Sequence, residues 1–144
     1  MSLTMTIRAL VVDGFPEHVA VLVQTLNHYG VDALGTNSGK EGLTLYRDRK
    51  PHLVIVGNGQ AKLTDGMRFW LFGHKLLGNE FSDRPYMVAL DGDHWAGSLN
   101  KRLAEECGFD DYTYKPIELS TLLKWVENAR LRAEGQEIKK ESTQ

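Results

Sequence analysis

The chain of 144 residues is short of cysteine, has no excess of either charge and contains no long apolar run. Cys107 is its only cysteine, which excludes an intrachain disulfide, a thiolate zinc cluster and a redox pair of thiols. Because 17 basic side chains stand against 19 acidic ones, no basic field is present to attract nucleic acid. No run approaches the roughly 20 apolar residues that cross a bilayer, and the first residues lack a signal-peptide pattern. These absences predict a cytoplasmic domain that binds neither nucleic acid nor membrane.

Short apolar segments alternate along the chain with stretches of helical periodicity. Residues 7–12 form a nearly continuous apolar run, typical of a strand buried on both faces. Pro16 suits the first turn of the helix that follows, and Gly30 lies where that helix would end. Four further strands are predicted over residues 31–35, 53–56, 86–90 and 111–114, with a polar loop over 57–66. Four further helices are predicted around residues 39–48, 67–77, 99–107 and 119–126.

Five strands that alternate with helices predict an α/β fold. Parallel neighbours need right-handed crossovers, so we expect a flavodoxin-like, doubly wound five-stranded parallel sheet, in the order 2-1-3-4-5, with helices on both faces. The domain is predicted to span residues 5–132, and residues 133–144 form a polar tail that frays. Such sheets place their sites at the carboxyl ends of the strands. The loops at those ends begin at Asp13, Gly57-Asn58, Asp91 and Lys115.

The segment over residues 108–116 reads Gly-Phe-Asp-Asp-Tyr-Thr-Tyr-Lys-Pro. Together with the residues named next, it resembles the receiver domains of two-component response regulators over about residues 7–130. The supporting residues are Val11-Val12-Asp13, Pro51, Asp65-Gly66 and Val88-Ala89-Leu90. The resemblance implies a signalling domain that is not an enzyme.

In receiver domains an aspartate that ends the third strand accepts a phosphoryl group. The matching position is Gly57 when counted from Pro51, or Asn58 when counted back from Asp65-Gly66. Glycine offers no nucleophile and the asparagine amide is a poor one. The resemblance therefore implies a degenerate receiver that lacks its phosphate-accepting carboxylate.

The remaining receiver positions depart from the family pattern, except for one. An acidic pair after the first strand holds Mg²⁺ in the family, and here it survives only as Asp13, because Gly14 takes the second place. We therefore expect no cofactor beyond weak Mg²⁺ binding at Asp13. Asp91 stands at the family's threonine or serine position, whereas Lys115 is retained. Because an unpaired buried ammonium would be costly, Lys115 is predicted to pair with Asp91 or Asp13.

The leading hypothesis is a pseudo-receiver that binds another protein without being switched by phosphorylation. The resemblance implies a histidine kinase or an output domain as the partner, and leaves a homodimer open. Tyr112 matches the family's aromatic switch position, on a face that receivers use for partners, and Trp95 is a second candidate for that face. The five histidines share no metal-ligand spacing and receive no role.

Several other interpretations stay open. The chain could be a working phosphoreceiver whose acceptor is Asp13, Asp91 or a deamidated Asn58. It could also be a flavodoxin-like enzyme or cofactor-binding domain, although it has no glycine-rich phosphate loop after the first strand. Finally, Lys115 could be a surface lysine, Asp13 could cap a helix, and Asp91 could belong to a turn.

Overall fold

The computed structural model describes residues 5–58, 84–91 and 108–135. It contains one five-stranded parallel sheet in the order β2-β1-β3-β4-β5. This confirms the predicted flavodoxin-like fold and its strand order. The strands are β1 (Arg8–Val12), β2 (Asp32–Thr36), β3 (Leu53–Asn58), β4 (Tyr86–Asp91) and β5 (Asp111–Tyr114).

Three helices are described, and local signals set their ends. Pro16 lies in the first turn of α1 (Pro16–His28), and Gly30 follows the helix at φ 85°, a conformation that glycine adopts without strain. Ser38 caps α2 (Gly39–Arg49) by accepting a hydrogen bond of 3.1 Å from the Glu41 backbone N–H. The third is α5 (Leu119–Ala133). Within the part of the chain that the structure describes, no helix is both long and apolar enough to cross a bilayer.

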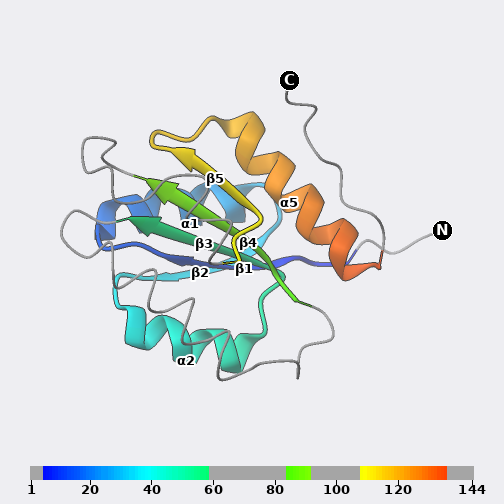
Figure 1. Cartoon of the computed structure of the whole chain (residues 1–144), viewed down its shortest axis with the longest axis horizontal. Coiled ribbons are helices and arrows are strands. Elements are labelled where there is room, and N and C mark those ends of the chain that lie inside the picture. The colour runs from blue at the N-terminus through cyan, green and yellow to red at the C-terminus, as the bar shows by residue number, and fades with distance from the viewer. Residues whose placement is uncertain (1–4, 59–83, 92–107, 136–144) are drawn as a thin grey trace.

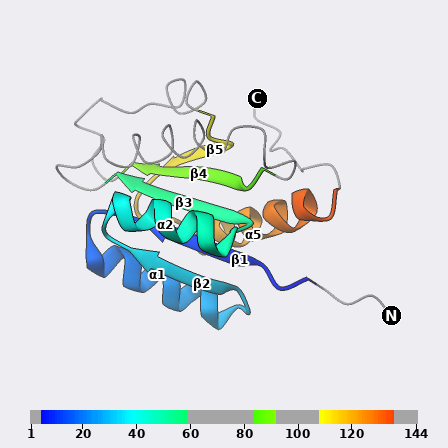
Figure 2. The same ribbon diagram turned by 90° about the horizontal axis from the view of Figure 1, so that it is seen from below.

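The core forms two layers, one on each side of the sheet. Successive strand residues point to opposite faces, so Val11 and Ile55 pack with α1 and α5, whereas Leu10 and Val54 pack with α2. Figure 1 shows α2 on one side of the sheet and α5 on the other, and the view from below in Figure 2 shows α2 in front of the strands. Both faces are therefore covered, as the continuous apolar runs of the strands require.

The predicted loop beginning at Gly57 is wrong by two residues. β3 continues through Gly57 and Asn58, which pair with Leu90 and Asp91 of β4. The hydrogen-bond ladder continues because β4 also extends to Asp91, and tertiary pairing overrides the turn preference of Asn-Gly. The predicted helices over 67–77 and 99–107 and the candidate Trp95 lie outside the described residues.

Candidate functional site

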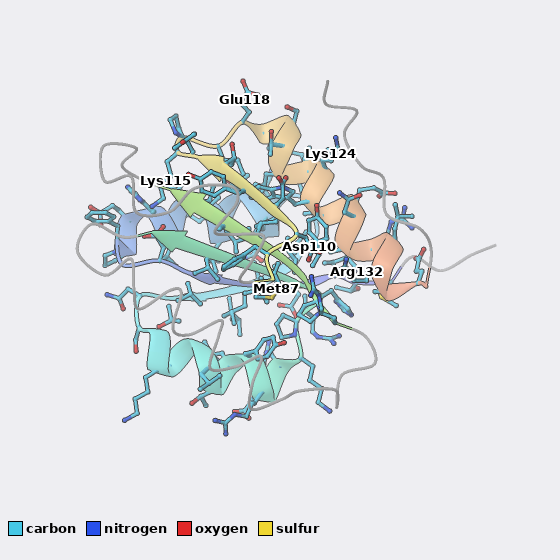
Figure 3. The ribbon with its side chains drawn as sticks, viewed as in Figure 1. Met87, Asp110, Lys115, Glu118, Lys124 and Arg132 are labelled. Carbon is cyan, nitrogen blue, oxygen red and sulfur yellow. The ribbon has the colours of Figure 1, made fainter. Side chains whose placement is uncertain are left out.

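The predicted site residues come together at the carboxyl edge of the sheet. Asp13 directly follows β1, and Lys115 directly follows β5. Asn58 and Asp91, the last residues of β3 and β4, are register partners at the same edge. Figure 3 shows Lys115 at the end of the sheet where the arrows of the strands point. The predicted convergence is confirmed for the backbone positions, and the structure does not describe the side chains of Asn58 and Asp91.

A buried ion pair occupies the centre of this edge. The Lys115 Nζ lies 2.5 Å from Asp13 Oδ2, and the two side chains are 13% and 0% exposed. The other carboxylate oxygen, Oδ1, accepts a hydrogen bond of 2.9 Å from the Phe15 backbone N–H. Charge-assisted bonds of this kind offset the cost of burying the two charges. The predicted pairing of Lys115 is thus confirmed with Asp13.

His18 and Phe15 also lie next to Lys115, and neither residue was assigned a role from the sequence. The Lys115 Nζ lies 2.8 Å from His18 Nδ1 and 5.6 Å from the centroid of the Phe15 ring. An ammonium can only donate, so Nδ1 must accept, which places the proton of a neutral His18 on Nε2. The ring of Phe15 adds a cation–π contact. The one sequence feature that could have pointed to them is their position: both residues lie within five positions of Asp13, at the start of α1.

Gly57 is the position at which Asp13 leaves no room for a side chain. A Cβ on Gly57 would lie 2.5 Å from Asp13 Cγ and 2.9 Å from Asp13 Cβ, and would overlap Oδ2. The Asp13 carboxylate therefore fills the space into which a side chain at position 57 would project. The acceptor position of receiver domains could match either Gly57 or Asn58 in this sequence. The geometry favours Gly57, because a side chain there would point at the ion pair.

Replacing Gly57 by alanine is expected to lower the free energy of unfolding by about 1–3 kcal/mol, because the added methyl overpacks the Asp13 carboxylate. Urea denaturation measures the loss. The same substitution in an Asp13→Ala background should cost less, because the colliding carboxylate has gone and only the contact with Cβ of residue 13 remains. The coupling follows from a double-mutant cycle. Equal losses in both backgrounds would show that Gly57 and Asp13 do not compete for this space.

The chemistry available at this edge is that of a closed charge pair. Both oxygens of Asp13 are engaged, and Gly14 and Gly57 offer no side-chain ligand. Among the side chains that the structure describes, which do not include those of Asn58 and Asp91, no three histidine, cysteine or acidic residues are grouped so that they could hold a metal ion. The described side chains therefore fit Mg²⁺ poorly, since this ion takes several oxygen ligands in a near-octahedral arrangement.

Tyr112, the candidate for a partner-binding face, is half-buried against the core layer on the α2 side. Its ring meets Tyr114 edge to face, with centroids 5.5 Å apart, and Tyr114 is 48% exposed. Packing against the core and against Tyr114 is therefore a structural reason for an aromatic residue at position 112. The role of Tyr112 in partner binding stays a prediction.

Comparison with known proteins identifies the fold. The chain is 27% identical over 120 residues to Protein PilH of Pseudomonas aeruginosa, an alignment that covers 83% of this chain and 93% of that protein. No protein-family model matches the sequence. A CheY-like response regulator receiver domain protein from Methanospirillum hungatei superposes with a TM-score of 0.74 at 20% identity, covering 91% of this chain and 99% of that one.

A receiver domain from Clostridium thermocellum gives a TM-score of 0.73 at 23% identity, over 89% of this chain and 97% of that chain. Both superpositions cover nearly the whole of the solved domains. The chain therefore has the fold of the response regulator receiver domains, as the motifs around Asp13 and Lys115 predicted.

Proposed function

We propose that this chain is a non-enzymatic receiver-like module of two-component signalling that binds a partner protein independently of phosphorylation. The ion pair between Asp13 and Lys115 carries the proposal, because it fills the space next to Gly57 from which an acceptor carboxylate would project. Lys115 thus has internally the kind of contact that a phosphoryl group would otherwise supply. The resemblance to receiver domains indicates a histidine kinase or an output domain as the partner.

A constitutive state follows from this arrangement. A ligand shifts a conformational equilibrium only through differential affinity for two states. When Lys115 is already held at 2.5 Å by Asp13, a phosphoryl mimic has little new contact to offer. We therefore propose that the module presents one binding surface at all times, with Mg²⁺ bound weakly.

The alternative of a working phosphoreceiver needs a nucleophile at this edge. Asp13 is a poor one because its side chain is fully buried and both of its oxygens are engaged. Asp91 and a deamidated Asn58 are the remaining candidates for an atypical acceptor. No contact among the described residues of this edge supports the other alternative, a cofactor-binding role on the same fold.

Incubation of the chain with acetyl phosphate and Mg²⁺ tests the proposal. Intact-mass measurement is expected to show no added phosphoryl group, because position 57 offers no carboxylate. A phosphorylatable receiver domain in the same tube is the positive control. Stable phosphorylation of this chain would contradict the proposal, and peptide mapping would then show whether Asp13, Asn58 or Asp91 is modified.

A magnesium titration serves as the companion control for the same experiment. A ligand raises the Tm only in proportion to its occupancy of the native state. We expect an almost unchanged Tm, whereas a large saturable rise at low metal concentration would contradict weak binding.

A further inference from the structure

A second polar cluster lies at the opposite, amino-terminal edge of the sheet. Asp110 precedes β5 and accepts hydrogen bonds from Arg84 Nη2 at 2.9 Å and from Arg132 Nη1 and Nη2 at 2.9 and 3.0 Å. Its Oδ2 also accepts a hydrogen bond of 2.8 Å from the Met87 backbone N–H. Figure 3 shows Asp110, Met87 and Arg132 together, at the far end of the sheet from Lys115. This carboxylate holds two guanidinium groups in fixed positions.

Backbone carbonyls fix the arginines of this edge further. Arg84 donates to the Gly108 carbonyl at 3.0 Å, and Arg132 donates to the Pro85 carbonyl at 3.0 Å. Arg8 donates to the carbonyls of Arg49 and Lys50 at 2.9 and 2.8 Å, which belong to the end of α2. Each guanidinium carries five N–H groups, so donors remain beyond these bonds. The three cations are therefore preorganised rather than free to rotate.

These arginines line a pocket of about 210 Å³ whose walls differ in character. Its apolar part is formed by the buried side chains of Tyr46, Pro51 and Pro85 together with Ala129. Its charged part is formed by Arg8, Lys50, Arg84 and Arg132, with His52 beside Arg8. The pocket thus combines an apolar surface with a positively charged surface.

The charge of the pocket is not balanced by the described residues that line it. None of those residues is acidic, and Asp110, which lies behind Arg84 and Arg132, supplies a single negative charge against four positive ones. His52 does not add a fifth, because burial and the nearby Arg8 lower the pKa of its imidazole. A pocket with low-dielectric walls concentrates the field of such cations.

We propose that this pocket binds the phosphate group of a small organic molecule, with the anion against the arginines and Lys50 and the organic group against the apolar wall. Arginine forks match the oxygens of phosphate, and Lys50 adds a point charge. The pocket is smaller than the roughly 300–1,000 Å³ that drug-sized ligands occupy, which favours a compact phosphate monoester over a nucleotide. The site is separate from the edge that holds Asp13 and Lys115.

Titration of the whole chain with phenyl phosphate at constant ionic strength, followed by NMR of the histidine rings, tests this assignment. The signal of His52 is expected to shift and saturate, whereas the signal of His18, at the Lys115 edge, should not move. Phenyl phosphate should bind about ten-fold more tightly than inorganic phosphate, as expected if roughly 60 Å² of apolar surface leaves water. Histidine signals are assigned with His52→Gln and His18→Gln variants.

The contribution of the Lys50 charge to phosphate binding is tested by comparing Lys50 with Lys40, a lysine at the opposite end of α2. Lys50→Asn, which tolerates the left-handed backbone at φ 48°, should weaken phenyl phosphate binding about two- to five-fold. Lys40→Asn removes the same charge at the other end of α2 and should leave the affinity unchanged. A shift of His18 instead of His52, equal binding of both phosphates, equal affinity in Lys50→Asn, or no saturable shift would each overturn the proposal.

Discussion

Replacing Lys115 by alanine is expected to lower the free energy of unfolding by about 3–5 kcal/mol, because the substitution leaves the fully buried Asp13 carboxylate without its counter-charge. The backbone N–H of Phe15 would still donate a hydrogen bond to that carboxylate. Urea denaturation at neutral pH measures the loss from the transition midpoint and slope. The large effect follows from burial, since an exposed ion pair contributes only about 0–1 kcal/mol.

Two variants separate the ion pair from other effects of losing a lysine. Lys40→Ala removes an exposed lysine of α2 and should change stability by less than about 0.5 kcal/mol. Asp13→Asn combined with Lys115→Ala removes both charges and should recover much of the loss, because no uncompensated charge remains. A loss below about 1 kcal/mol in Lys115→Ala would mean that water reaches the Asp13 carboxylate.

Replacing Asp110 by alanine is expected to cost about 3 kcal/mol, because two guanidiniums and one backbone N–H lose their shared acceptor. Its side chain is 13% exposed, whereas those of Arg84 and Arg132 are 39% and 25% exposed, so solvent compensates the arginines only in part. Thermal or urea unfolding gives the size of the loss.

Asp110→Asn and Asp32→Ala are the controls for this network. The asparagine keeps one acceptor oxygen and removes the charge, so a smaller loss than that of Asp110→Ala is expected. Asp32 pairs with Arg49 at 3.9 Å on the exposed surface, and its removal should cost less than about 1 kcal/mol. If Asp110→Ala cost no more than Asp32→Ala, Asp110 would not organise the arginines of the amino-terminal edge.

The two edges of the sheet differ in how far their charges are matched. Among the described side chains of the carboxyl edge, Lys115 pairs with the buried carboxylate of Asp13. At the amino-terminal edge, four cations and no acidic residue are among the described residues that line the pocket, and Asp110 holds two of these cations from behind. This contrast is why we propose a constitutive contact at the first edge and an anion site at the second.

Local sequence patterns, which span only a few residues, predicted the strands and helices of the described part of the chain well. The apolar run of β1, the Pro16 start of α1 and the Ser38 cap of α2 act within a few residues, so the sequence shows them directly. The end of β3 was mispredicted because the pairing of Asn58 with Asp91 depends on a strand about 30 residues away in the chain. Turn chemistry alone favoured a loop at Gly57.

The sequence by itself determined the class of fold, the edge at which Asp13 and Lys115 meet, and the absence of a carboxylate at position 57, because alternation of strands and helices fixes which strand ends lie together. Only the tertiary structure decided that Asp13, 102 positions away, pairs with Lys115, and that the Asp13 carboxylate takes the space beside Gly57. It also brought Arg84 and Arg132 to Asp110. Such contacts depend on side-chain packing across strands and helices, which no local pattern encodes.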